Sequence, residues 1–332
     1  MKRFLLKTAA FLLALTLITL GVNALYIRKN GYPETFTKER FEKVPDQIDI
    51  AVFGSSHAEG AFVTDLFEPE YTLFKFSGGN QVLSMDARLM EYYRDRMREG
   101  GYALITVSYF SLFGIPTQET QVFEARNKAY YWALPPRMIM QYDRLTDICI
   151  RYLPSLTASF EIFKLLPFAD AAGKQEEEEP VTEEEQYLSD IGGQTTKERV
   201  AETVGLRYEQ HLIKEKLDEN GERIVNREEI DALYRMIEIC KEEGVTPVLV
   251  TTPVIAEYSG MIHEKDPAFF EQFYGIIDQI CKETGAAYYD YSEDERFIYD
   301  YTLFADNDHT NLLGSSKFTR IFAQEALGIT LP

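Results

Sequence analysis

Two short stretches near opposite ends of the chain carry the side chains best suited to chemistry. The first is the sequence Gly-Ser-Ser-His at positions 54–57, which ends an apolar run. The second places Asp306 three residues before His309. A serine hydroxyl can attack a carbonyl carbon when a histidine takes its proton and a carboxylate holds the histidine ring. The two stretches together therefore predict a serine nucleophile with its base and its orienting acid.

Within these stretches, each catalytic role has a preferred residue. Ser56 is preferred to Ser55 as the nucleophile because it lies one residue further into the turn, where a side chain can leave the strand. His309 is the expected base, since Asp306 on the same turn can accept the imidazole Nδ1–H and fix the tautomer. Asp308 is adjacent to the histidine in sequence and is less well placed to fold back onto the ring.

The elements that must position these residues follow an α/β pattern, and small residues at the end of a first strand lie where such sheets bind ligands. Strands are expected at residues 48–53, 71–76, 102–109, 246–252 and 287–291. Helices are expected at residues 82–99, 228–243, 266–284 and 312–327. The first expected helix is given its end by two glycines at its carboxyl terminus.

The order and placement of the two motifs resemble the SGNH (GDSL-type) hydrolase superfamily. The likeness is strongest to its membrane-anchored, cell-envelope branch, which includes the protein that helps to D-alanylate teichoic acids and O-acetyltransferase-like proteins of polysaccharide export. It covers residues 47–114 and 228–327. In the family's Gly-Asp-Ser-Leu block the nucleophile is the third residue, which matches Ser56, while Ser55 replaces the family's aspartate.

The resemblance implies a three-layer, flavodoxin-like parallel sheet and serine esterase or O-acyltransferase chemistry. It also implies oxyanion donors: the backbone N–H of Ser56 and the turn at Gly79. The family's third donor, an asparagine after the third strand, is missing, because residues 107–111 read Val-Ser-Tyr-Phe-Ser. Asn80 is either the substitute donor or a helix N-cap. His57 and Tyr109, beside these motifs, are assigned to substrate binding.

Metal and cofactor motifs are not recognisable. An EF-hand over residues 306–317 would need glycine in place of Asn311 and glutamate in place of Lys317. The sequence has no Cys-x-x-Cys and no phosphate-binding loop. We therefore predict neither a metal nor a cofactor. The cysteines are expected to be buried apolar residues, and a disulfide between Cys240 and Cys281 stays open.

The middle of the chain interrupts the α/β pattern. Residues 117–226 are expected to form a helical insertion between the two parts of the α/β domain, residues 47–116 and 227–332. The insertion begins with an aromatic, helical part and contains the acidic, low-complexity residues 170–186, which are expected to form a mobile loop. Whether the insertion covers the site or packs elsewhere stays open.

The N-terminus is expected to lie outside the folded domain. Residues 1–29 contain an apolar run of about the length that spans a bilayer, preceded by basic residues, and residues 30–46 form a linker. This pattern predicts a single-pass helix with the remaining chain outside the cytoplasm. The competing interpretation is a signal peptide cleaved after Val22-Asn23-Ala24. We favour the anchor because the apolar run continues past that site.

The overall charge limits the class of partner. The chain of 332 residues has 34 Lys+Arg against 54 Asp+Glu, a formal net charge of −20. Nucleic acid is a poor partner for such a chain, because its binding needs a basic face. The resemblance implies instead a cell-surface polysaccharide or teichoic acid-like polymer as substrate and a membrane acyltransferase as partner. The alternative is a non-catalytic, membrane-tethered binding or assembly factor, since one oxyanion donor is missing.

Overall fold

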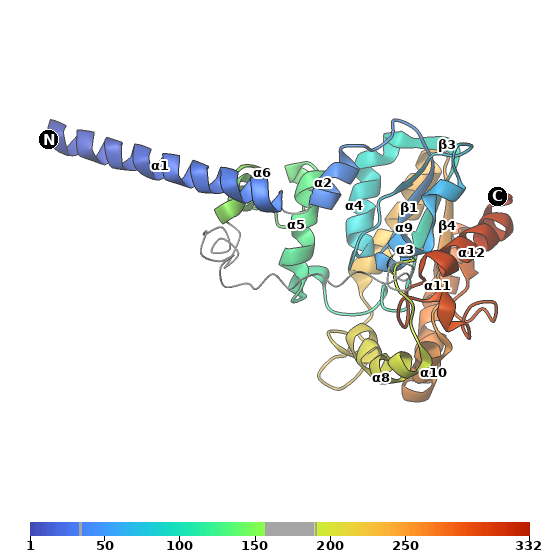
Figure 1. Cartoon of the computed structure of the whole chain (residues 1–332). Helices are drawn as coiled ribbons and strands as arrows, with labels where there is room; N and C mark the ends of the chain where they lie inside the picture. The colour runs from blue at the N-terminus through green and yellow to red at the C-terminus, as the bar shows by residue number, and fades with distance from the viewer. Residues whose placement is uncertain (33–34, 157–188, 190) are drawn as a thin grey trace. The chain divides into compact units, whose positions relative to one another are not determined.

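The computed structural model describes residues 1–32, 35–156, 189 and 191–332, and the chain falls into two compact units (Figure 1). Unit 1 consists of residues 1–43 and 124–180, and unit 2 consists of residues 44–123 and 181–332. These units cut across the insertion expected at residues 117–226, whose boundaries stay a prediction. The acidic loop expected at residues 170–186 lies outside the described residues.

Unit 2 is built on a five-stranded, fully parallel sheet with the order β2-β1-β3-β4-β5. The strands are β1 (Ile48–Phe53), β2 (Leu73–Lys75), β3 (Met97–Thr106), β4 (Thr246–Thr251) and β5 (Ala287–Asp290). This is the strand order of a flavodoxin-like sheet, which the family resemblance implied, and the α/β fold class is confirmed.

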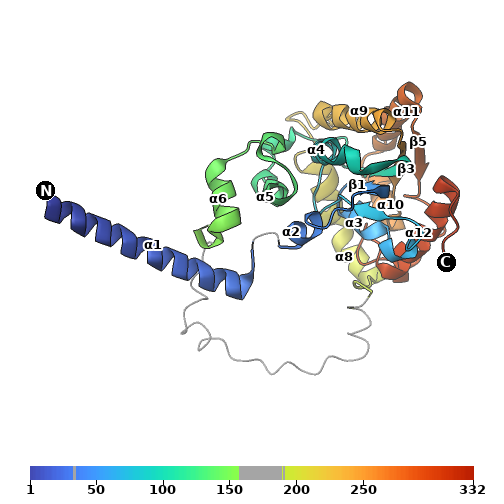
Figure 2. The same ribbon diagram turned by 90° about the horizontal axis from the view of Figure 1, so that it is seen from above.

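Helices cover both faces of this sheet and make the three layers of the fold. The helices of unit 2 are α3 (Ser56–Ala61), α4 (Leu83–Tyr93), α8 (Lys197–Tyr208), α9 (Arg227–Glu242), α10 (Ala256–Lys265), α11 (Phe269–Thr284) and α12 (Leu312–Phe322). Single turns of π-helix continue α8 over Glu209–Ile213 and α12 over Ala323–Leu327. Figure 2 shows α4, α9 and α11 on one face of the sheet and α3 and α12 on the other.

The core forms because strands and helices present continuous apolar surfaces to one another. All of β1 except Asp49 is buried, as expected for a strand covered on both faces. On α11 the buried side chains Phe269, Phe273, Ile277 and Ile280 recur every three or four residues, so one face of the helix packs against the sheet.

The segment before β3 differs from the prediction. The helix expected to continue to residue 99 ends at Tyr93, and β3 begins four residues later at Met97. Gly100 and Gly101 lie inside this strand, where the pairing with β1 shifts in register. A Cβ at Gly101 would lie 2.5 Å from the carbonyl oxygen of Asp49. The two glycines therefore permit a bulge against β1 and do not end a helix.

A second difference lies between β4 and α11. The sequence suggested one helix from residue 266, but the structure has two helices, α10 and α11, and Asp266 ends the first of them. Helix α10 contains Ser259 and Gly260, whose low helix propensity hides it from a propensity argument. Its buried residues Tyr258 and Ile262 hold it in place through tertiary packing.

Unit 1 is helical. It contains α1 (Lys2–Asn30), α2 (Thr35–Phe41), α5 (Phe123–Ala133) and α6 (Arg144–Tyr152), with 3₁₀ turns at Pro136–Met138 and Pro154–Leu156. Helix α5 belongs to this unit from its second residue, Glu124. Within the described part of the chain, α1 is the one helix long and apolar enough to cross a membrane. This agrees with the expected single-pass segment.

Candidate active site

The serine turn is positioned by a glycine at the end of β1. Gly54 has φ +132°, and a Cβ there would lie 2.9 Å from the Cβ of Thr106 and 3.0 Å from that of Ala58. A side chain at this position would force neighbouring backbone apart, so the sharp turn into α3 requires glycine. The carboxyl end of β1 and the first turn of α3 are thereby held close to β3.

The two serines of this turn have different surroundings. Ser55 is buried and is the N-cap of α3, where its hydroxyl accepts the backbone N–H of His57 at 3.4 Å. Ser56 is half-buried, and its Oγ lies 2.8 Å from Nε2 of His309. The structure therefore gives Ser55 a capping contact and leaves Ser56 with the histidine that the sequence assigned to it.

The Asp306–His309 turn orients the histidine ring. His309 Nδ1 lies 2.9 Å and 3.0 Å from the two carboxylate oxygens of Asp306. The same carboxylate accepts the backbone N–H of His309 at 2.9 Å, so the turn closes on itself. With Nδ1–H donated to Asp306, Nε2 is left to accept the hydroxyl proton of Ser56. The three residues thus form a continuous chain of hydrogen bonds with the polarity of a serine triad.

The charges around His309 favour its protonated form. Burial lowers the pKa of His309, but the hydrogen bond to Asp306 and the negative charges of Asp308 and Asp306 outweigh it, so the pKa lies above its usual value. Burial likewise raises the pKa of Asp306, but the contact with His309 outweighs it and the pKa is lowered. Asp306 is therefore a carboxylate at neutral pH.

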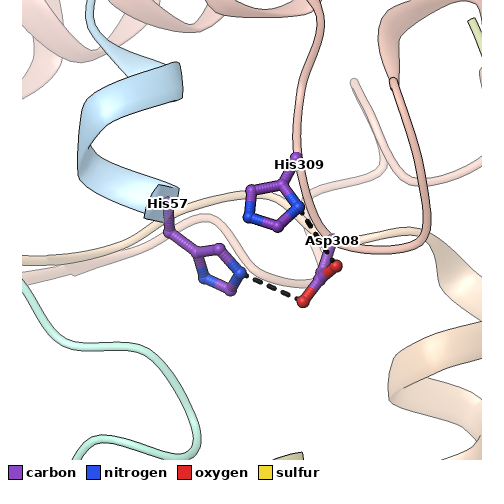
Figure 3. Close-up of side chains that lie close together, drawn as sticks. All are labelled: His57, Asp308 and His309. Atoms are coloured by element: carbon purple, nitrogen blue, oxygen red, sulfur yellow. Dashed lines mark hydrogen bonds and ion pairs between the residues drawn. The ribbon is translucent and has the colours of Figure 1, made fainter. Parts of the chain in front are cut away.

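A second chain of hydrogen bonds runs beside the first. Nε2 of His57 lies 3.0 Å from Oδ2 of Asp308, and Nδ1 of His57 lies 2.8 Å from Oγ of Ser108. His57 thus donates Nε2–H to Asp308 and accepts the hydroxyl proton of Ser108. Figure 3 shows His57 and Asp308 next to His309, and the centroids of the two imidazole rings are 4.8 Å apart.

Arg207 connects the two series of hydrogen bonds. Its Nη2 lies 2.9 Å from Oδ2 of Asp306, and its Nε lies 3.1 Å from Oδ1 of Asp308. His211, one turn further along the same helical segment, places Nδ1 3.2 Å from Oδ2 of Asp308. One guanidinium therefore partly neutralises two neighbouring carboxylates, and α8 with the π-helical turn that continues it reaches the site through residues four apart.

The protonation states of the buried groups follow from these contacts. Burial raises the pKa of Asp308, but the hydrogen bond and charge of His57, with His211 and His309, hold that pKa far below its usual value. Burial lowers the pKa of His57, and it lowers the pKa of His211 to about 3. At neutral pH the cluster therefore contains two carboxylates, one guanidinium and two neutral imidazoles around His309.

Gly79 and Asn80, which were predicted to be oxyanion donors, belong to one turn. The N–H of Gly78 donates to the carbonyl of Gly54 at 3.2 Å, so the turn containing Gly79 and Asn80 lies beside the serine turn. Gly79 and Asn80 are exposed, and Asn80 has φ +57°, a left-handed conformation that asparagine tolerates. The N-cap of α4 is Val82, so the N-cap interpretation of Asn80 is wrong.

The two residues assigned to substrate binding are both buried. His57 is 6% exposed and has partners on both ring nitrogens, as described above. Tyr109 is 2% exposed and packs edge-to-face against Phe270 and Phe273 of α11. A substrate contact by Tyr109 would require this aromatic cluster to open.

Most residues of the second series of hydrogen bonds were not predicted from the sequence. Arg207 and His211 lie in the expected insertion, and their spacing of four residues on a helical segment is the one signal that places both on a common face. Asp308 was given no role because it adjoins His309, although adjacent residues of a turn can face different partners, as Asp308 faces His57 and His309 faces Ser56. Ser108 belongs to residues 107–111, the stretch in which the resemblance implies an asparagine and this sequence has none.

Three residues of the site lie close enough together to share a metal ion. His57, Asp308 and His309 offer ligand atoms that lie within 4.8 Å of one another. The ring nitrogens are already engaged in the hydrogen bonds described above, and the guanidinium of Arg207 beside Asp308 opposes a further cation. These residues suit a hydrogen-bonded network, and the expectation of no metal stays a prediction.

All three cysteines are free thiols, so no disulfide joins Cys240 to Cys281.

Comparison with known proteins gives a family match over part of the chain. Residues 170–321 match the family model of the DltD protein. The matched segment includes Arg207, Asp306 and His309, and Ser56 lies outside it. The match confirms the resemblance to the SGNH-type, cell-envelope branch that the motifs indicated. No curated protein matches the chain.

Two solved structures illustrate the structural likeness. A Bacteroides fragilis protein assigned as an acylhydrolase has 10% sequence identity and a TM-score of 0.39, with 89% of this chain and 95% of that chain covered. The acetylxylan esterase Axe2 from Geobacillus stearothermophilus has 13% identity and a TM-score of 0.37, with 85% and 95% covered. At these scores the likeness carries no argument about activity, and the fold rests on the strand order itself.

Proposed function

We propose that this chain is a membrane-anchored, serine-dependent acyltransferase or esterase that acts on acyl esters of a cell-envelope polymer. The observation that carries the proposal is the hydrogen-bonded series Ser56–His309–Asp306, with 2.8 Å between Ser56 Oγ and His309 Nε2. The match to the DltD protein family supports the envelope polymer as the site of action.

The proposed reaction uses His309 twice. Ser56 Oγ attacks the acyl carbonyl carbon while Nε2 of His309 takes the hydroxyl proton. The tetrahedral intermediate collapses, the donor alcohol leaves with the proton from His309, and an acyl ester remains on Ser56. An acceptor hydroxyl then gives its proton to His309 and attacks the same carbonyl carbon. The acyl group moves to the acceptor, and Ser56 recovers its proton.

The negative charge on the intermediate needs hydrogen-bond donors that are in place before the reaction. The backbone N–H of Ser56, at the start of α3, is the first proposed donor. The exposed turn of Gly79 and Asn80, beside the serine turn, supplies the others. Asn80 takes the role that an asparagine after the third strand fills in the resembling family.

Asp308 and Arg207 are proposed to adjust the charge of His309. When His309 accepts a proton, Asp306 stabilises the imidazolium directly, and Asp308 adds a second negative charge 3.4 Å from Nδ1. Arg207 contacts both carboxylates and offsets part of their effect. The base is therefore strong enough to take a serine proton without being held permanently protonated.

The acyl group is proposed to pass to a hydroxyl of a cell-surface glycopolymer, such as a polysaccharide or teichoic acid-like polymer, with acetyl or a similar small acyl group as cargo. A membrane acyltransferase is the proposed donor partner. Helix α1 is proposed to span the membrane, with unit 2 on the outer side, because basic residues precede its apolar run. Anchoring would keep Ser56 close to an envelope-bound substrate.

A second function is favoured by one observation. Residues 107–111, where the resemblance places the family's third oxyanion donor, contain no asparagine, and the hydroxyl of Ser108 among them is engaged with His57 at 2.8 Å. A site that lacks this donor stabilises the intermediate less. The alternative is therefore a non-catalytic, membrane-tethered factor that binds or assembles components of polysaccharide modification.

Covalent labelling separates the two functions. The full-length protein in detergent is incubated with a fluorophosphonate, and the labelled peptide is identified by mass spectrometry. An enzyme is expected to carry the label on Ser56, and Ser56→Ala should abolish it. A properly folded protein that takes no label, and turns over no aryl ester, would support the binding factor.

Transfer is separated from hydrolysis by adding an acceptor. The protein is expected to hydrolyse a simple aryl ester slowly, and an oligosaccharide should divert the acyl product from free acid to ester. Fast hydrolysis that is insensitive to every acceptor would instead identify an esterase.

A further inference from the structure

One side of α6 in unit 1 is apolar and exposed. Leu145, Ile148 and Tyr152 are 72%, 37% and 68% exposed, and Leu156 in the following turn is 59% exposed. The first three are spaced by three and four residues, so they form one stripe along the helix. We call these four residues the α6 apolar face.

The rest of α6 packs as a helix of a folded domain does. Ile150, on the other side, is 1% exposed, and Asp147 pairs with Arg151 at 2.6 Å. The guanidinium of Arg151 also lies over the ring of Trp132 in α5, 5.2 Å from its centroid. The helix therefore has a well-packed side and, opposite it, a side whose apolar residues are exposed in the part of the chain that the structure describes.

Asn23 fixes the end of α6 to α1. The Nδ2 of Asn23 donates to the carbonyl of Tyr152 at 2.9 Å, and its Oδ1 accepts the N–H of Ser155 at 3.2 Å. Asn23 and Tyr26 are the buried residues of α1, whereas most of the helix is exposed. Both polar atoms of the Asn23 amide are thus hydrogen-bonded, which offsets the free-energy cost of burying a polar side chain on an apolar helix.

The position of Asn23 along α1 sets the depth of this contact. Asn23 precedes Arg28, the first basic residue after the apolar run, by a helical rise of about 7.5 Å. Amphipathic helices that lie in a membrane surface bury their apolar side roughly 5–10 Å into the boundary between headgroups and acyl chains. The contact with Tyr152 therefore falls at the depth where such a helix lies.

We propose that α6 and the turn after it lie in the lipid–water interface beside the C-terminal end of α1, with the α6 apolar face against the acyl chains. The partner is the lipid bilayer itself. Tyr152 suits this position, because an aromatic ring with a polar hydroxyl is favoured at the headgroup level. The inference rests on α1 spanning the membrane and is independent of the chemistry at Ser56.

The consequence is a second attachment to the membrane. A single helix followed by a polar linker would let unit 1 swing, whereas an interfacial helix tied to the same membrane segment fixes its tilt. The side chain of Asn23 is the tie between the two.

Depth-dependent quenching tests the proposal on the full chain in phosphatidylcholine vesicles. The single tryptophan is removed by Trp132→Phe, and Leu145→Trp places a reporter on the α6 apolar face. Lipids brominated near the carbonyl end of the acyl chain should lower the reporter's fluorescence by about twofold or more, and lipids brominated near the chain end should quench it less. Leu156→Trp is the second reporter, in case the first variant misfolds.

The matched control is Glu238→Trp on α9, whose side chain is 63% exposed and lies among charged groups. It should show no quenching by either lipid. Quenching of the α6 reporters no greater than this control would overturn the proposal. So would efficient cross-linking of two chains through Cys149 without quenching, which would identify a second copy as the occupant. Release of the chain by alkaline carbonate would refute the anchor, and labelling of Ser56 would still report the proposed function separately.

Discussion

His57 Nε2 lies 3.0 Å from Asp308 Oδ2, and both side chains are buried. The residue after the serine is thereby bonded to the residue before the histidine, in parallel with the Ser56–His309 contact. The turn after β1 and the turn that follows β5 are thus joined by two hydrogen bonds side by side. We infer that the buried pair holds the two turns in register for the reactive pair.

Asp308→Asn tests this buried pair. The change removes the negative charge that faces His57, His211 and Arg207, so it should lower the free energy of unfolding by about 3 kcal/mol. Urea unfolding followed by circular dichroism measures the loss. The control is Asp278→Asn, which removes an exposed carboxylate from α11 and should change the free energy by less than about 0.5 kcal/mol. Equal, small effects of the two changes would contradict the stabilising role of Asp308.

The choice of nucleophile is tested by comparing the two serines. Ser56→Ala should abolish fluorophosphonate labelling, whereas Ser55→Ala should retain it and lower stability by about 1 kcal/mol through loss of the α3 cap. His309→Ala should slow labelling by roughly a hundredfold or more, because the hydroxyl loses its base. Mass spectrometry of the labelled peptide gives the answer, and labelling that is lost with Ser55 but kept with Ser56 would reverse the assignment.

The pH dependence of labelling reports on His309. The base works in its neutral form, so the rate should rise with pH through a pKa above the ordinary value of 6.5. The positive charge of Arg207 lowers this pKa, so Arg207→Gln should move the rise to higher pH. Arg207→Lys should largely restore the wild-type profile, and Lys197→Gln, an exposed change on the same helix, should leave it unchanged. A shift to lower pH in Arg207→Gln would refute the charge-balancing role.

Asp86, beneath the serine turn, should make stability depend on pH. It accepts the N–H of Gly54 at 3.0 Å and also bonds to Gln81, and burial raises its pKa to about 8. The folded protein therefore holds a proton there that the unfolded chain releases near its ordinary pKa of 3.8. Stability contributed by this group should be complete below that lower pKa. It should fall as pH rises toward 8, by at most about 1.4 kcal/mol per pH unit.

The matched variant for this effect is Asp86→Asn, which keeps an oxygen for the N–H of Gly54 but does not titrate. Its melting temperature should exceed that of the wild type at pH 8, and the difference should shrink toward pH 5. Thermal unfolding at both pH values measures it. Parallel pH profiles of the two proteins would show that Asp86 is not the titrating group.

Much of the fold follows from local patterns in the sequence. The limits of β1 agree with the prediction because six consecutive residues, Ile48–Phe53, are apolar except for one and stop at a glycine turn. The start of β3 disagrees with the prediction, because the bulge at Gly101 depends on the approach of Asp49 from another strand. Helix α10 was missed because its packing, through Tyr258 and Ile262, outweighs its weak propensity.

In the candidate site, too, the local pattern was predictable from the sequence and the long-range contacts were not. The Ser56, Asp306 and His309 assignment came from residue types and from a three-residue spacing on one turn, and the structure brings the three together. The pairing of His57 with Asp308 joins residues 251 positions apart, and no local spacing encodes it. Long-range pairs of this kind depend on how the turns at the end of the sheet fold over one another.

The sequence separation within the reactive pair also has a consequence for biosynthesis. Ser56 and His309 are 253 positions apart. A ribosome makes the serine long before the histidine, so the nascent chain carries a hydroxyl without its base while the intervening residues are made. The proposed chemistry at Ser56 can begin only when the turn of His309 has docked against the serine turn, so this long-range docking acts as a folding checkpoint on the nucleophile.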